Sequence, residues 1–131
     1  MKKYLLDTHF LLWLLLDTKQ IKQNLLDIIL DGKNQIFYSD ISLWEIAVKM
    51  KIGKLSFDKE IEELPKALHL QNVENLPLKH EHIFETLKID VKEQHKDPFD
   101  RLIIAQAKSE NLVIITNDAK FLLYSDIDIL F

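Results

Sequence analysis

Short apolar segments alternate with longer segments of helical periodicity along the chain. The short segments are expected to form strands or extended chain over residues 3–6, 36–38, 73–78, 112–115 and 127–130. The longer segments are expected to form helices over residues 8–16, 20–31, 41–52, 58–69, 80–88, 98–111 and 119–124. Strands that alternate with helices predict an α/β sandwich with a mostly parallel sheet, formed as one domain by residues 1–131.

Glycine, proline and capping residues set the expected ends of these helices. Gly32 is expected to end the helix over residues 20–31, and Gly53 the helix over residues 41–52. Ser39 and Asp40 precede that second helix and are both suitable N-cap residues. Pro65 lies inside the segment 58–69, where we expect it to kink or break the helix.

Composition narrows the possible functions. The chain has no cysteine, so disulfides and thiolate metal sites are excluded. Its net charge of −4 argues against a simple basic surface for nucleic acid. Asp7 and His9 interrupt the apolar amino-terminal run, no cleavage site follows, and no span is long enough for a membrane helix. We therefore expect a soluble cytoplasmic protein.

Aspartates recur where the expected strands end and the adjoining helices begin. Asp7 and Asp118 directly follow strands, so a helix cap and a functional site are equally good interpretations of each. For Asp40 and Asp97 the cap is the favoured interpretation. Asp97 is followed by Pro98, a combination typical of a helix start.

Glu45 and Asp100 are expected to lie among apolar side chains, which is unusual for a carboxylate. On a helix, Glu45 shares its face with Ile41 and Val48, and Asp100 shares its face with Ile103. An unpaired charge on a buried face costs free energy, so each carboxylate requires a partner.

If Asp7, Glu45, Asp100 and Asp118 converge, their mutual repulsion raises their pKa values, and a divalent cation relieves it. A donor set of carboxylate oxygens without cysteine fits Mg²⁺ or Mn²⁺ rather than zinc. Such an ion can activate a water toward a phosphodiester. Convergence itself is an assumption at this stage, because only the fold can bring Asp7 and Asp118 together.

Four stretches of the sequence resemble the motifs of PIN-domain proteins, and specifically of VapC-type toxins of toxin–antitoxin systems, in order and in spacing. They are YLLDTH at residues 4–9, SDISLWEIAVK at 39–49, HKDPFDRLIIAQA at 95–107 and ITNDAKF at 115–121. The resemblance covers essentially the whole chain. It implies a single PIN domain with an α/β/α fold and a Mg²⁺- or Mn²⁺-dependent endoribonuclease.

By position, the resemblance places the acidic catalytic and metal site on Asp7, Glu45, Asp100 and Asp118, and Thr116 matches the hydroxyl residue of the last motif. It also implies a homodimer that is held inactive by a cognate VapB-like antitoxin. The sequence does not indicate which RNA is cleaved or how many metal ions bind.

Several further residues have possible supporting roles. Thr116 and Ser39 could hold waters or orient a carboxylate. Arg101, the only arginine, could contact the phosphate of RNA or pair with an acid, and the phosphate contact is the less favoured of the two. His95 belongs to the motif of the family, but its role and that of Asp97 stay open.

The remaining histidines and tryptophans have simpler interpretations. His80 and His82 are two residues apart, do not share a helix face, and are interpreted as surface residues rather than metal ligands. Trp13 and Trp44 are interpreted as core side chains rather than surfaces for stacking RNA bases.

Two other functions compete with the nuclease. A phosphatase of the haloacid dehalogenase type requires Asp at the first and third positions after its first strand, and His9 occupies the third position here. A non-catalytic interaction module of the same fold is the second alternative. It ranks lower, because such a module has no need for four acids near one buried position.

Overall fold

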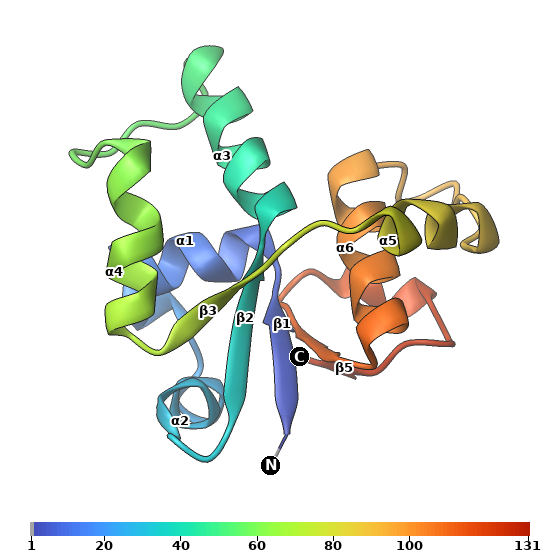
Figure 1. The fold of residues 1–131 in the computed structure, drawn as a ribbon, viewed down its shortest axis with the longest axis horizontal. Helices are drawn as coiled ribbons and strands as arrows, with labels where there is room; N and C mark the ends of the chain where they lie inside the picture. The colour runs from blue at the N-terminus through green and yellow to red at the C-terminus, as the bar shows by residue number, and fades with distance from the viewer. Residues whose placement is uncertain (1) are drawn as a thin grey trace.

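The computed structural model describes residues 2–131, and these residues form a five-stranded parallel sheet in the order β3-β2-β1-β4-β5 (Figure 1). The strands are β1 (Lys3–Leu6), β2 (Gln35–Ser39), β3 (Val73–Leu76), β4 (Val113–Ile115) and β5 (Ile129–Leu130). The α-helices are α1 (Thr8–Leu16), α2 (Gln23–Leu30), α3 (Asp40–Lys51), α4 (Leu64–Leu70), α5 (His80–Glu85) and α6 (Pro98–Glu110). Short 3₁₀ turns are η1 (Thr18–Gln20), η2 (Ile61–Glu63), η3 (Thr86–Lys88) and η4 (Ala119–Leu123).

Helices cover both faces of the sheet and create two hydrophobic clusters. Alternate side chains of a strand point to opposite faces. Tyr4 and Leu6 of β1 therefore join a cluster with α1, α2 and α4, whereas Leu5 joins a second cluster with α6. Ile115 and Ile114 of β4 divide in the same way. The predicted three-layer α/β/α architecture is confirmed, and no helix in residues 2–131 is long and apolar enough to cross a membrane.

Two expected helix boundaries are wrong, each for a local reason. The segment 20–31 forms η1 and the shorter helix α2, which ends at Leu30 before the glycine. Gly32 is absent from the residues with positive φ among residues 2–131, so it does not act as a left-handed cap. Pro65 lies in the first turn of α4, where its missing N–H costs nothing, and therefore helps to start this helix rather than kinking it.

One of the two expected caps before α3 is also wrong. Ser39 is the N-cap, because its hydroxyl accepts a hydrogen bond from the Ile41 N–H at 2.9 Å. Asp40 instead accepts hydrogen bonds from the Asn75 side chain at 2.7 Å and from the Leu78 N–H at 3.0 Å. It thus fastens β3 and the chain that follows to α3. At the other end of α3, Gly53 adopts a φ of +79°, which confirms the expected stop.

The strand order places a topological switch between β1 and β4. From β1 the chain proceeds outward through β2 and β3, and it later returns to the other side of β1 as β4 and β5. Crossover connections leave neighbouring strands of such a sheet in opposite directions at this point, which opens a crevice at their carboxyl ends. The amino ends of α1, α3 and α6 supply the side chains around this edge, described below.

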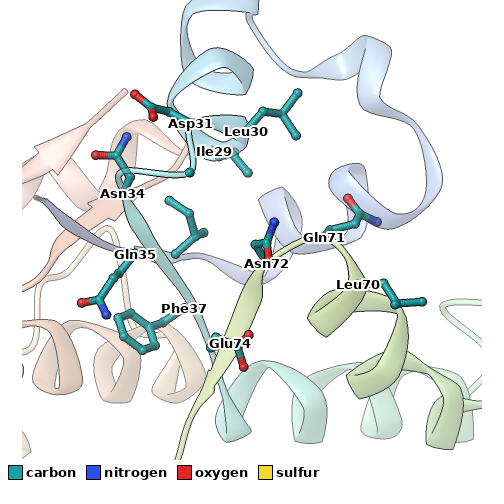
Figure 2. A pocket seen from close by; sticks show the side chains of 12 residues that line it. Ile29, Leu30, Asp31, Asn34, Gln35, Phe37, Leu70, Gln71, Asn72 and Glu74 are labelled. Carbon is teal, nitrogen blue, oxygen red and sulfur yellow. The ribbon is translucent and has the colours of Figure 1, made fainter.

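The opposite, amino edge of the sheet is hollowed as well. A space of about 580 Å³ lies between the end of α2, the beginnings of β2 and β3, and the end of α4 (Figure 2). Its polar lining is mostly amide, from Asn34, Gln35, Gln71 and Asn72. No buried acid contributes to this lining, since Asp31 and Glu74 are both exposed.

Candidate active site

Asp7 lies at the switch point, directly after β1, and is 2% exposed. One carboxylate oxygen accepts the Phe10 N–H at 2.8 Å and so caps α1. The other accepts a hydrogen bond from the Thr116 hydroxyl, across 109 positions of sequence. Asp7 therefore caps α1, which confirms that interpretation, and its carboxylate also lies at the carboxyl edge of the sheet, where a functional site was expected.

Thr116 links the ends of β1 and β4. Besides donating to Asp7, its hydroxyl accepts the N–H of Asp118 at 3.0 Å. Asp118 in turn accepts the N–H of Lys120 at 3.0 Å and caps η4. One buried hydroxyl thus fixes two of the predicted acids relative to each other.

Glu45 approaches this edge from the second turn of α3 and is 3% exposed. Its Oε2 pairs with Lys49 at 2.8 Å, whereas its Oε1 is buried without a hydrogen-bond partner in residues 2–131. A hydrogen bond of 2.9 Å from the Thr8 hydroxyl to the Ser42 hydroxyl joins the amino end of α1 to α3. The burial predicted from the apolar neighbours of Glu45 is confirmed.

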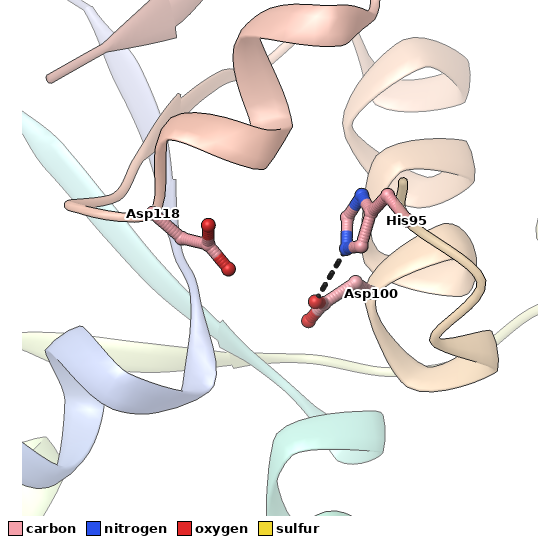
Figure 3. Close-up of side chains that lie close together, drawn as sticks. All are labelled: His95, Asp100 and Asp118. Carbon is pink, nitrogen blue, oxygen red and sulfur yellow. Dashed lines mark hydrogen bonds and ion pairs between the residues drawn. The ribbon is translucent and has the colours of Figure 1, made fainter. Parts of the chain in front are cut away.

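Asp100 lies in the first turn of α6, next to His95 and opposite Asp118 (Figure 3). Its Oδ2 is 2.8 Å from Nε2 of His95. Ligand atoms of His95, Asp100 and Asp118 all lie within 4.8 Å of one another. Asp97 caps α6 by accepting the N–H groups of Phe99 and Asp100, as predicted from the Asp-Pro pair.

Burial raises the pKa of two of these carboxyl groups. Burial is the largest influence on Asp7, with the Asp118 charge adding to it and the hydrogen bond from Thr116 opposing it. Burial likewise raises the pKa of Asp100 to about 6; the hydrogen bond with His95 opposes this, and the charges of Asp97 and Glu45 add to it. Asp118 thus influences Asp7, and Glu45 influences Asp100, while the proximity of Asp100 and Asp118 brings the two pairs together.

The arrangement fits a divalent cation held by oxygen atoms. Asp100 and Asp118 are the two acids that the geometry brings within joint ligand distance, while Asp7 and Glu45 border them. The unpartnered Oε1 of Glu45 and the raised pKa values of Asp7 and Asp100 both indicate negative charge that residues 2–131 leave uncompensated. A divalent cation that prefers carboxylate oxygen would supply that compensation.

Ser39 lies away from the acids in a buried polar network. Its hydroxyl donates to Oε1 of Gln106 on α6, and the amide nitrogen of Gln106 lies 3.4 Å from Nδ1 of His82 on α5. Nδ1 of His82 also accepts the Lys79 N–H at 3.0 Å. The network joins α3, α5 and α6, so Ser39 contacts Gln106 and not one of the four acids.

The interpretation of His82 as a surface residue is wrong. His82 is 1% exposed, because α5 packs against α6 and presents this side chain to Gln106, with Glu110 3.7 Å from Nε2. His80 is exposed as predicted. Sequence spacing separated the two faces of α5 correctly, but it carried no information on which face α6 covers.

The interpretation of Trp44 as a core residue is also wrong. Its side chain is 59% exposed and packs edge-on against Phe99, with ring centroids 5.0 Å apart. Trp13 is partly buried against the core, in agreement with its interpretation. Arg101 donates from Nη2 to the Lys96 carbonyl at 3.3 Å and forms no ion pair with an acid in the described part of the chain.

A parallel sheet with acids gathered at its switch point defines the class: an α/β protein of the kind that binds ligands at the carboxyl edge of its sheet. The family follows from the sequence. Residues 4–126 match the model of the PIN domain, so this chain belongs to the PIN domain family. Among curated proteins, no sequence matches the chain significantly.

Solved structures share the fold at low sequence identity. A chain of VapBC2 from Rickettsia felis, bound to a DNA fragment of the promoter, is 21% identical with a TM-score of 0.70, over 98% of this chain and 97% of that one. A chain of VapBC-1 from nontypeable Haemophilus influenzae is 23% identical with a TM-score of 0.69, over 98% and 96%. A chain of DNA-bound VapBC from Salmonella typhimurium is 20% identical with a TM-score of 0.67, over 99% and 98%.

Proposed function

We propose that this protein is a divalent-metal-dependent endoribonuclease and the toxin of a toxin–antitoxin pair, acting in the cytoplasm. The observation that carries the proposal is the meeting of Asp100 and Asp118 at the switch point, bordered by the buried acids Asp7 and Glu45. Membership of the PIN domain family and the shared fold of the VapBC chains support it. Buried acids are costly, so a site that retains Asp7 and Glu45 beside Asp100 and Asp118 has a use for their charge.

In this proposal, Asp7, Glu45, Asp100 and Asp118 hold Mg²⁺ or Mn²⁺. When bound, the ion supplies a water activated for attack on phosphorus and neutralises the developing charge of the phosphodiester. The residues of the chain prepare the site: Thr116 fixes the carboxylate of Asp7, and Lys49 holds one oxygen of Glu45. Arg101, beside Asp100, is the candidate for a contact with the RNA backbone.

The expected protein partners are a VapB-like antitoxin and a second copy of the chain. Support for the antitoxin comes from the similar structures, which are complexes named VapBC. An antitoxin that covers the carboxyl edge would block the candidate active site, and this would explain how a cell tolerates the ribonuclease. Size-exclusion chromatography with light scattering, on the protein with and without the product of an adjacent gene, tests both partners.

Induced expression in a bacterial host tests the function. The protein and its Asp100→Asn form are compared by growth and by total RNA. We expect growth arrest with discrete RNA fragments from the unaltered protein only. The purified protein should cleave RNA with Mn²⁺ and lose this activity with a chelator. Folded protein that cleaves no RNA with Mg²⁺ or Mn²⁺ and binds neither ion would instead support the non-catalytic module.

A further inference from the structure

His95 is a buried side chain at the candidate site, and the proposed function gives it no role. It is 3% exposed, and its Nε2 lies 2.8 Å from Oδ2 of Asp100. It belongs to the loop before α6, where its N–H donates to the Lys92 carbonyl at 3.0 Å. The backbone that carries the imidazole is therefore fixed close to the helix that carries Asp100.

Two aromatic rings fix the imidazole itself. The ring of Phe121 lies 5.4 Å from it and the ring of Tyr124 lies 5.6 Å from it, both measured between centroids. Phe121 and Tyr124 are themselves buried in the cluster beneath α6. A ring packed in this way has few alternative rotamers, so the direction in which Nε2 points is determined by the core.

The hydrogen bond also determines which nitrogen carries the hydrogen. An ionised carboxylate only accepts, so Nε2 of His95 is the donor to Oδ2 of Asp100. Nδ1 is buried and has no hydrogen-bond partner in residues 2–131. A hydrogen on Nδ1 would be buried without an acceptor, which is unfavourable. The surroundings thus favour the tautomer with its hydrogen on Nε2.

We infer that His95 is a positioning residue for the cation: its Nε2–H holds Oδ2 of Asp100 and leaves Oδ1 as the oxygen that faces the ion. No hydrogen bond to Oδ1 occurs in the described residues. Hydrogen-bonded outer partners commonly orient the ligands of metal sites in this way. The inference rests on the proposed metal-dependent function. It adds that His95 acts through Asp100 and is not itself a ligand.

This role also explains the choice of metal. With Nε2 engaged as a donor, the ligands that remain near Asp100 are oxygens, including that of Asp118. Oxygen ligands favour Mg²⁺ or Mn²⁺, whereas an imidazole ligand would shift the preference toward zinc and similar ions. His95 therefore contributes to selectivity for Mg²⁺ or Mn²⁺ over zinc, because its Nε2 is not available as a ligand.

Titration of Mn²⁺, followed by the electron paramagnetic resonance of the free ion, tests the inference independently of activity. His95→Leu keeps most of the bulk but removes the donor, and we expect its dissociation constant for Mn²⁺ to increase by about 10- to 100-fold. His95→Gln restores an N–H near the same position, and we expect it to recover most of the lost affinity. Equal affinity of the wild type and His95→Leu would overturn the inference.

A matched control separates positioning from general damage to the fold. His82 is a second buried histidine, which contacts Gln106 and Lys79 rather than an acid of the site. We expect His82→Leu to lower the melting temperature and leave the Mn²⁺ affinity within about twofold, by analogy with distant sites whose effects are independent. An equal loss of affinity in both leucine variants would assign the effect of His95 to stability alone and overturn the inference.

Two spectroscopic signatures distinguish a positioning residue from a ligand. Electron spin echo modulation of bound Mn²⁺ should show no directly coordinated ¹⁴N, and ¹⁵N NMR of the imidazole should show the hydrogen on Nε2. A coordinated nitrogen would overturn the inference while leaving a metal-dependent nuclease intact. Failure of the proposed function looks different: the wild type then binds no Mn²⁺, or it binds Mn²⁺ with the expected dependence on His95 but cleaves no RNA.

Discussion

The two edges of the sheet carry similar residue types in opposite environments. At the amino edge, Asp31 and Glu74 line an open hollow, and both side chains are exposed. At the carboxyl edge, Asp7 and Glu45 are 2% and 3% exposed. Water solvates the first pair of charges, whereas the second pair depends on the protein or on a bound ion. The comparison teaches that the desolvation of acids, and not the presence of a hollow, distinguishes the candidate active site.

The largest expected effect is on RNA cleavage. Asp118→Asn removes a charge that borders Asp100 and should lower the rate of Mn²⁺-dependent cleavage by more than about 100-fold, because the loss of an outer partner alone costs about 10- to 100-fold. Glu74→Gln removes a charge at the amino edge and should leave the rate within about twofold. Cleavage of a labelled RNA by both purified variants checks the comparison, and equal losses in the two variants would remove the distinction between the edges.

The next effect is a dependence of stability on pH that arises at the carboxyl edge. Burial raises the pKa of Asp100 from 3.8 to about 6, so the folded state favours its neutral form. The stabilisation from protonated Asp100 is present below pH 3.8 and is lost as the pH rises through about 6.

In metal-free buffer, Asp100→Asn should therefore raise the free energy of unfolding at pH 7 by on the order of 1 kcal/mol, and change it little near pH 4. Urea denaturation at the two pH values measures this difference. Added Mn²⁺ should stabilise the wild type at pH 7 and reverse the order of the two proteins. A variant that is less stable than the metal-free wild type at pH 7 would show that Asp100 carries no uncompensated charge.

A smaller effect concerns buried hydrogen bonds. Ser39→Ala removes the N-cap of α3 and leaves the side-chain oxygen of Gln106 without its donor, so we expect a loss of about 1–3 kcal/mol in the free energy of unfolding. At the amino edge, Asn34→Ala removes one partly buried hydrogen bond to the Ile28 carbonyl and should cost about 0.5–1 kcal/mol. Chemical denaturation of both variants compares them; the reverse ranking would contradict the burial argument.

The smallest effect is expected from Gly32→Ala, at the wall of the amino-edge hollow. A Cβ there meets no atom within 4 Å, and the backbone has no positive φ. The change should alter the free energy of unfolding by less than about 0.5 kcal/mol, as surface substitutions usually do. Gly53→Ala is the internal standard, because its φ of +79° disfavours a Cβ by about 1–2 kcal/mol. Melting temperatures of the two variants should differ accordingly.

Most of the fold could be predicted from the sequence, because hydrophobic periodicity and capping residues indicate the same bounds for most elements. The strand at residues 3–6 and the helix at 8–16 occur with the expected bounds, and Asp97 caps α6 as its Asp-Pro pair predicts. The burial of Glu45 was also predictable, since apolar residues share its helix face. Neighbours three and four positions away are known from sequence alone.

The errors arose where a distant element decided the outcome. His82 is buried because α6 covers one face of α5, and Asp40 is a tether because β3 brings Asn75 close to it. Trp44 is exposed on a helix that is largely apolar, and sequence periodicity does not show which side of such a helix stays uncovered. His95 was noticed as part of a motif, but its contact with Asp100 depends on the loop that precedes α6.

The hydrogen bond from Thr116 to Asp7 spans almost the entire chain, and this has a consequence for protein synthesis. A ribosome that has made residues 1–115 has already produced Asp7, Glu45 and Asp100. It has made neither the hydroxyl that fixes Asp7 nor the carboxylate of Asp118. A nascent or prematurely terminated chain that stops before residue 116 therefore lacks an assembled site, and under the proposed function it could not yet cleave RNA.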